Sequence, residues 1–297
     1  MLKNKNDIRS VLYMIVTTAL FIFLWMKGGT LSTLVFIPLY IGFLFMSVSV
    51  AVMAHNHNHL NMWKSKWMNR LTDNWLTIFY GFPVFAWIPT HNANHHKYVN
   101  KEEDYTKTYR FTEKNNLFTV LTYPSISGFF QQQVVWGYFK EVFARNKTKG
   151  FFYALQFVVL VSWIVGAFYF GGWQKALVYV VIPQQVSLFS VLLFNYIQHV
   201  HADEETKYNS SRNWEGVLNY MLFNNGLHTV HHLYPTLHWS EAPAKHQEIR
   251  HKIDDSLIET SFWGFLFRVY IMGLFSDKYK TKSMRVARMQ NEKAQAA

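Results

Sequence analysis

The order of apolar and polar residues divides this 297-residue chain into long apolar runs and polar, histidine-rich segments. Four runs approach the roughly 20 consecutive apolar residues that a helix needs to cross a membrane. They are residues 11–26, 31–54, 151–170 and 176–197. Only a few residues separate the two members of each pair, so each pair is predicted to form an antiparallel hairpin. The pattern therefore predicts four transmembrane helices.

Three further apolar segments are too short or too mixed to be spans. Residues 75–89 are interrupted by a glycine and two prolines, which is typical of a re-entrant or interfacial segment. Residues 117–145 and 262–275 mix aromatic with amide or basic side chains, which indicates helices that lie on the membrane surface. We therefore predict an all-α integral membrane fold, with two hairpins of spanning helices and a helical cytosolic cap. It forms a single domain over residues 1–297.

The distribution of charge predicts the orientation. The chain carries 29 Lys and Arg against 18 Asp and Glu, a formal net charge of +11. Of the basic residues, only Lys27 and Lys175 lie in the two predicted hairpin turns. Because basic loops stay in the cytosol, both termini are predicted to be cytosolic, and we expect a bacterial inner membrane. The charge is then expected to meet anionic lipid or an acidic protein. Nucleic-acid binding is not expected, because no recognition module is evident.

Eleven of the fourteen histidines fall in four short groups. The groups are HNHNH at residues 55–59, HNANHH at 91–96, QHVH at 198–201 and HTVHH at 228–232. On a helix, positions i and i+4 share a face, so such histidines can point at a common centre. Two groups directly follow the second and fourth apolar runs, which brings both to one side of the membrane. One four-coordinate zinc would leave most of these ligands idle, so the groups predict two metal ions.

The remaining histidines do not have this spacing. His57 lies two positions from His55, so it points away from the ligand face and is expected to support a ligand or lie at the surface. His201 stands in the same relation to His199. Three others are expected to be ordinary polar residues: His238, His246 and His251.

The motifs HNHNH, HNANHH and HTVHH resemble, in order and spacing, the three histidine boxes of the membrane-bound fatty acid desaturase/hydroxylase superfamily. NYIQH at residues 195–199 resembles the extra ligand motif of its alkane-hydroxylase-like members. The resemblance covers about residues 30–250 and places the boxes at 55–59, 91–96, 195–201 and 228–232. It implies nine metal ligands: His55, His59, His91, His95, His96, His199, His228, His231 and His232.

The resemblance also implies a reaction. Members of the superfamily hold two non-haem Fe ions that activate O2, the co-substrate, and remove hydrogen from an unactivated C–H bond of an acyl or alkyl chain. We predict an O2-dependent fatty acyl desaturase that inserts a double bond. The alternatives are a hydroxylase or a terminal-alkene-forming fatty acid decarboxylase of the same fold. More distant are a membrane zinc hydrolase of lipid amides and a transporter. The transporter is disfavoured because the spans carry almost no charge.

Each ligand histidine needs an acceptor for its second ring nitrogen. Acidic and amide residues near the boxes are candidates, and among them we favour Asp203 and Asn225, together with His201. The other candidates are Asp104, Glu204 and Asn224.

The chain has no cysteine, which excludes Cys-bound iron–sulfur clusters and thiolate-ligated haem within it. With no fused carrier either, we expect a separate soluble electron carrier, similar to ferredoxin or rubredoxin. A basic cytosolic tail at residues 277–297 is one candidate dock, and a grip on anionic lipid is the alternative. Its cations are Lys278, Lys280, Lys282, Arg285 and Arg288.

Overall fold

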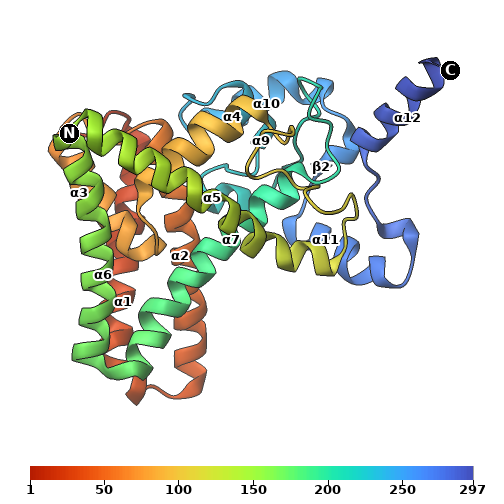
Figure 1. The fold of residues 1–297 in the computed structure, drawn as a ribbon. Helices are drawn as coiled ribbons and strands as arrows, with labels where there is room; N and C mark the ends of the chain where they lie inside the picture. The colour runs from red at the N-terminus through yellow and green to blue at the C-terminus, as the bar shows by residue number, and fades with distance from the viewer. Residues whose placement is uncertain (297) are drawn as a thin grey trace. The chain divides into compact units, whose positions relative to one another are not determined.

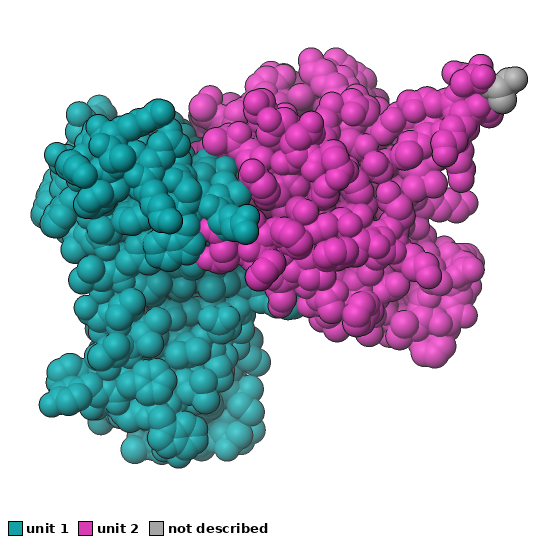
Figure 2. All heavy atoms as spheres, in the orientation of Figure 1, with its two compact units in different colours: residues 1–89, 133–191 teal, residues 90–132, 192–297 magenta. Residues whose placement is uncertain are grey.

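The computed structural model of the chain describes residues 1–296, and its regular structure is helical apart from one two-stranded parallel sheet (Figure 1). Ala297, the last residue of the predicted tail, lies outside the described residues. The chain forms two compact units (Figure 2). Unit 1 contains Met1–Pro89 and Gln133–Val191, and unit 2 contains Thr90–Gln132 and the chain from Leu192 onward.

Unit 1 is built mainly from long helices. Its α-helices are α1 (Ile8–Lys27), α2 (Thr33–His59), α3 (Lys66–Tyr80), the last part of α5 (Leu117–Arg145), α6 (Lys147–Ala176) and the first part of α7 (Ile182–His199). Its 3-10 turns are Lys5–Asp7, Gly28–Thr30 and Val84–Ala86. A π-helical segment, Leu177–Val181, leads into α7, and another, Ile88–His95, leads out of the first part of the unit.

Three helical stretches among the described residues are long and apolar enough to cross a membrane. They are Lys5–Thr30, Thr33–His59 and Lys147–His199. Only 17% to 39% of their most apolar windows is buried, so most of this apolar surface faces outward. Exposed apolar surface of this extent is typical of contact with lipid. The stretches therefore indicate an integral membrane protein.

The third stretch is too long for a single straight span. Its 53 residues would extend about 80 Å as one helix, against a hydrocarbon core of roughly 30 Å. Gly172 breaks the helical geometry with φ 71° and ψ 172°, a conformation that glycine adopts without a steric penalty. Figure 1 shows the chain turning back between α6 and α7. The predicted runs 151–170 and 176–197 lie on either side of this glycine.

Small polar side chains join the helices of unit 1. Ser187 Oγ on α7 donates a hydrogen bond of 2.8 Å to the Ser47 carbonyl on α2. Gln184 Nε2 donates to the Ile78 carbonyl on α3 at 2.7 Å. Gly81 ends α3 with φ 89°, and a Cβ there would lie 2.5 Å from the Gln184 Cβ. Close packing and interhelical hydrogen bonds are the usual means by which membrane helices associate.

Unit 2 is built from short helices and ordered loops. Its α-helices are α4 (His96–Tyr98), the first part of α5 (Leu117–Arg145), the end of α7, α8 (Val217–Met221), α9 (His228–Leu233), α10 (Ala242–Ile249), α11 (Phe262–Leu266) and α12 (Met284–Ala296). Its 3-10 turns are Arg250–Lys252, Asp255–Leu257, Met272–Leu274 and Asp277–Tyr279, and Phe267–Ile271 is π-helical. Strand β1 (Asn213–Trp214) pairs in parallel with β2 (Ile258–Glu259). The predicted helix at residues 117–145 has the same bounds as α5.

A buried apolar cluster in unit 2 supports the segment that carries the last histidine box. Val230, in the middle of α9, packs with Ala202, Ile249, Ile253 and Leu257, all buried. An α-helix of only six residues is unstable by itself, so this packing is what fixes α9 in place.

The basic tail is tied to the loop that follows α7. Arg285 Nε donates to Glu204 Oε1 at 3.0 Å, and Arg288 Nε donates to Asp203 Oδ1 at 2.9 Å. Both carboxylates are nearly buried, with side-chain exposures of 5% and 7%. We refer to Asp203, Glu204, Arg285 and Arg288 as the tail ion-pair cluster.

Candidate metal centre

The six residues of α9 present two histidines on one face. His228 and His232 are four positions apart, one helical turn. Asn213 in β1 holds the helix by its first turn, because its Oδ1 accepts from the Thr229 N–H at 3.0 Å and its Nδ2 donates to Thr229 Oγ1 at 2.8 Å. The strand thereby determines where this face points.

A first histidine cluster in unit 2 combines this face with two other elements. His95 comes from the end of the π-helical segment and His199 from the end of α7. His199 Nε2 lies 3.1 Å from His228 Nε2 and 3.2 Å from His232 Nε2, and the latter two are 3.1 Å apart. The candidate ligand atoms of all four residues lie within 4.8 Å of one another.

These distances fit a shared metal ion. Two imidazole nitrogens bound at about 2.1 Å, with angles between octahedral and tetrahedral, would lie roughly 3.0–3.4 Å apart. His95 Nε2 is buried and has no hydrogen-bond partner among the described residues. Burial, together with the charge that His228 and His96 would carry, holds the pKa of His232 well below its ordinary value. Neutral rings that converge on one point offer lone pairs to a cation.

A second cluster lies in the same unit. His91 Nε2 is 3.2 Å from His231 Nε2 and 3.1 Å from His96 Nε2, and the latter two are 2.9 Å apart. The His96 ring centroid is 4.8 Å from that of His232 in the first cluster. Two neighbouring sets of converging imidazoles suit a site for two metal ions.

The first histidine box lies in unit 1, in the last turn of α2. His55 and His59 are one turn apart, and their ring centroids are 4.9 Å from each other. His55 Nδ1 lies 3.0 Å from Asn56 Oδ1, which leaves the His55 Nε2 atom for another partner.

Asp104 orients His95 in the first cluster. His95 Nδ1 donates to Asp104 Oδ2 at 2.7 Å, which fixes the His95 lone pair on Nε2. The carboxylate also accepts from the backbone N–H of Asn100 and of Thr106, each at 2.7 Å. Burial opposes its ionisation, but the attraction of His95 and these hydrogen bonds outweigh that effect and hold the pKa of Asp104 below its ordinary value. Asp104 was a candidate from the sequence, although not a favoured one.

His199 is oriented by backbone. Its Nδ1 donates to the Ser210 carbonyl at 2.9 Å. Arg212, a buried residue two positions further on, donates from Nη1 to the Ile197 carbonyl at 3.1 Å and to the Val200 carbonyl at 3.0 Å. The guanidinium therefore satisfies carbonyls at the end of α7, where a cation is also favourable for the helix dipole.

The favoured supporting residues have other partners in the structure. Asp203 pairs with Arg288, and His201 lies between the Glu113 carbonyl (2.7 Å) and Thr281 Oγ1 (2.8 Å). The Asn225 carbonyl accepts from Gln198 Nε2 at 2.9 Å, next to His199 in the sequence. Within the part of the chain that the structure describes, these contacts are not with a ring of the two clusters.

His57 is buried rather than at the surface. Its Nδ1 accepts from the Met62 N–H at 3.2 Å, so the ring proton lies on Nε2, which faces Asp73 Oδ1 at 3.5 Å. Nε2 forms no hydrogen bond with a described residue, but its approach to Asp73 brings α2 into contact with α3 within unit 1.

The family comparison agrees with this geometry. Residues 28–263 match the family described as fatty acid desaturase, a range that includes all four histidine groups. No curated protein gave a significant match to the chain. The matched region covers most of the chain and contains the two buried clusters. The protein therefore belongs to the fatty acid desaturase family, a family of oxidoreductases.

Proposed function

We propose that this protein is an O2-dependent fatty acyl desaturase that uses two histidine-bound irons. The observation that carries the proposal is the convergence of ring nitrogens into two neighbouring clusters at 2.9–3.2 Å. Imidazole ligands suit iron, and the family match favours it over other metals. When bound, the irons would supply the O2 chemistry that breaks an aliphatic C–H bond, for which no side chain is a strong enough oxidant.

The ligand set that we propose has nine members. One ion would be held by His95, His199, His228 and His232. The other would be held by His91, His96 and His231, and the resemblance of the first box adds His55 and His59. Asp104 and the Ser210 carbonyl would keep His95 and His199 in the tautomer that presents Nε2.

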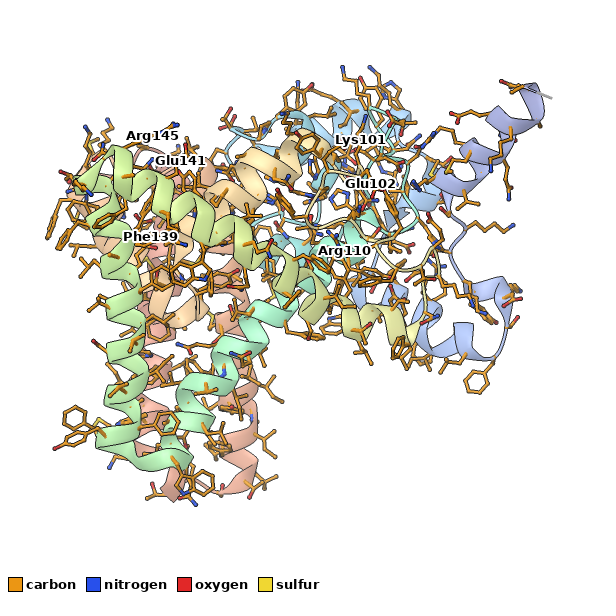
Figure 3. All side chains as sticks on the ribbon, viewed as in Figure 1. Lys101, Glu102, Arg110, Phe139, Glu141 and Arg145 are labelled. Atoms are coloured by element: carbon orange, nitrogen blue, oxygen red, sulfur yellow. The ribbon has the colours of Figure 1, made fainter. Side chains whose placement is uncertain are left out.

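An apolar cavity of about 160 Å³ in unit 2 supports a fatty substrate. Phe111, Phe118 and Ile126 line it, and Arg110, whose guanidinium lies over the Phe130 ring, supplies a cation for an acidic head group (Arg110 is labelled in Figure 3). Tyr123 also lines the cavity, and its hydroxyl donates to the Thr106 carbonyl. Thr106 Oγ1 lies 3.0 Å from His95 Nδ1, so one short chain of contacts joins the cavity wall to a proposed ligand.

Four spans and cytosolic termini complete the proposal. The third apolar stretch would cross the membrane twice, with the turn at Gly172 between the two crossings. The basic residues outside the hairpin turns would then face the cytosol, in line with the positive-inside rule.

Electrons would come from a separate carrier similar to ferredoxin or rubredoxin. Acidic carriers of this type are attracted by exposed cations, and the attraction weakens as salt screens it. The tail offers fewer such cations than its sequence indicates, because Arg285 and Arg288 are engaged in the tail ion-pair cluster. Lys278 and Lys282 remain exposed and are the better candidates for a dock.

Lipid profiling in a host that expresses the protein tests the reaction. We expect a new double bond in acyl chains by mass spectrometry, and its loss in His95→Ala and His228→Ala. The exposed His251→Ala is the matched control and should keep activity. A new alcohol would identify hydroxylation instead of desaturation. A shortened 1-alkene would identify decarboxylation. Purified protein that holds one zinc and works without iron would contradict the di-iron centre.

A further inference from the structure

A second pocket, in unit 1, has no part in the proposed metal centre. It has a volume of about 460 Å³, within the roughly 300–1,000 Å³ range of small-molecule sites. It lies between α3 and the start of α6, and its lining is rich in polar and charged groups: Arg70, Asp73, Asn146, Thr148, Lys149, Phe152, Tyr153 and Gln156.

Two cations in this pocket have no acidic partner within ion-pair distance among the described residues. The Arg70 guanidinium stacks on the Phe152 ring, with its carbon 3.5 Å from the ring centroid. Lys149 Nζ lies 5.6 Å from the centroid of the Tyr153 ring. Stacking on aromatic rings leaves the N–H groups of both cations available for an anion.

A buried phenol adds a third polar group. Tyr153 is 8% exposed, and its ring lies 6.2 Å, centroid to centroid, from that of Tyr138, whose hydroxyl interacts with it. A phosphate oxygen would offer the Tyr153 hydroxyl a charged acceptor, which is stronger than a second phenol. This phenol lines the same pocket as the two cations.

The position of the pocket along α6 suggests what fills it. Asn146, Thr148 and Lys149 belong to the polar start of the helix, whereas Phe152 and Tyr153 lie in the apolar run that follows. The pocket therefore spans the change from polar to apolar residues, which in a spanning helix lies at the level of the lipid head groups. Here α6 belongs to a candidate span and α3 does not, and basic pockets beside the cytoplasmic ends of spanning helices are typical sites for phosphate-bearing head groups.

We propose that this pocket binds the phosphate group of a membrane phospholipid through Arg70, Lys149 and the Tyr153 hydroxyl. The Asp73 carboxyl is the one acidic group in the lining. It faces His57 Nε2 at 3.5 Å, so the lipid would sit against the contact that links α2 to α3. The site would serve to hold the cytosolic end of unit 1 to the lipid.

Native mass spectrometry of the delipidated protein tests this, with phosphatidylglycerol and the matching diacylglycerol, which has the same tails and no phosphate. We expect preferential retention of phosphatidylglycerol and a loss of roughly tenfold or more in the double variant Arg70→Gln/Lys149→Gln. Arg145→Gln is the control. It removes a nearby cation that is outside the pocket lining and already pairs with Glu141 at 2.9 Å (Figure 3). Retention in this control should stay within about twofold of wild type.

Further variants keep the test decisive if the double variant is unstable. Lys149 is exposed, so Lys149→Gln leaves the fold intact and should lower retention by itself, as should Tyr153→Phe. Asp73→Asn should keep or increase retention, because it removes a negative charge. A loss in Asp73→Asn would mean that the ligand is a cation and would overturn the proposal.

Two other outcomes would also overturn it. The first is equal retention of phosphatidylglycerol and diacylglycerol by wild type. The second is binding of inorganic phosphate, lost in the double variant, without any preference for the phospholipid, which would identify a site for free phosphate.

Discussion

At the scale of single residues, two histidine rings of the first cluster are held through Nδ1, the nitrogen that is not the proposed metal ligand. Asp104 and the Ser210 carbonyl do this for His95 and His199. A ring held in one tautomer presents its lone pair in a fixed direction, which lowers the cost of assembling a metal site.

Replacing Asp104 tests this arrangement. Asp104→Asn keeps the size of the side chain but removes the charge that fixes His95, so metal affinity should fall by about 10–100-fold. The measurement is the metal retained per protein after dialysis against a chelator. Asp277→Asn, which changes an exposed carboxylate paired with Lys280, should retain metal as wild type does. Equal retention in both variants would show that the contact with Asp104 is dispensable.

The Asp73 carboxyl makes the stability of the protein depend on pH. Burial raises the pKa of its carboxyl from 3.8 to about 7, against a smaller lowering effect from Arg70. The folded state thus keeps a proton that the unfolded state has lost between these values. The contribution of Asp73 to the free energy of unfolding is therefore largest below its ordinary pKa and falls as pH rises to about 7.

Asp73→Asn should remove this dependence. Relative to wild type, the variant should gain stability on the order of 1–2 kcal/mol at about pH 8 and less at about pH 5, with allowance for solvent at the partly exposed carboxyl. Thermal unfolding in detergent at both pH values measures the difference. A gain that is larger at the acidic value would contradict the raised pKa.

At the scale of elements, the sequence predicts the long helices well. Apolar runs and histidine spacing depend on neighbours along the chain, so α2 and the bounds of α5 follow from the pattern. The contacts that orient the rings could not be predicted in the same way. Ser210 contributes a backbone carbonyl, which every residue has, so its identity gives no signal. Asp203 is predicted from the sequence to support a ligand, but in the structure it pairs with Arg288.

Arg212 also makes contacts that could not be predicted from the sequence, and these contacts support the end of α7. It is buried, it donates to two carbonyls of that helix end, and its Nε lies 3.9 Å from Glu259 Oε1. Arg212→Met would leave these two carbonyls without their donor, whereas Glu259 would keep Arg268, whose Nη2 lies 2.6 Å from Glu259 Oε1. The free energy of unfolding should therefore fall by about 1–3 kcal/mol. Denaturant unfolding in detergent micelles provides the measurement.

A matched control separates burial from charge. Arg250→Met removes a more exposed guanidinium that pairs with Glu215, and it should cost less than about 1 kcal/mol. Similar losses in the two variants would mean that Arg212 has no special role at the helix end.

At the scale of the whole molecule, the four-span proposal predicts which positions face outward. The chain has no native cysteine, so single cysteines can be introduced without a background. Gly29→Cys has open space around the new Cβ and Gln174→Cys is exposed, and both should react with an impermeant thiol reagent added outside intact cells. Lys207→Cys and Asn291→Cys, also exposed, should react only after the cells are opened. Labelling of Asn291→Cys from outside would contradict cytosolic termini.

The tail ion-pair cluster has a consequence for the synthesis of the protein. Asp203 and Glu204 are made about eighty residues before the arginines that neutralise them. Until residue 288 has left the ribosome, two carboxylates next to the third histidine group have no cation to accompany their burial, a deficit of several kcal/mol. We therefore expect the loop after α7 to reach its final packing only after the tail has been synthesised. A chain that ends before Thr281 would contain every histidine group, but Val230 of the last box would pack against Ala202 in a loop that lacks its cations.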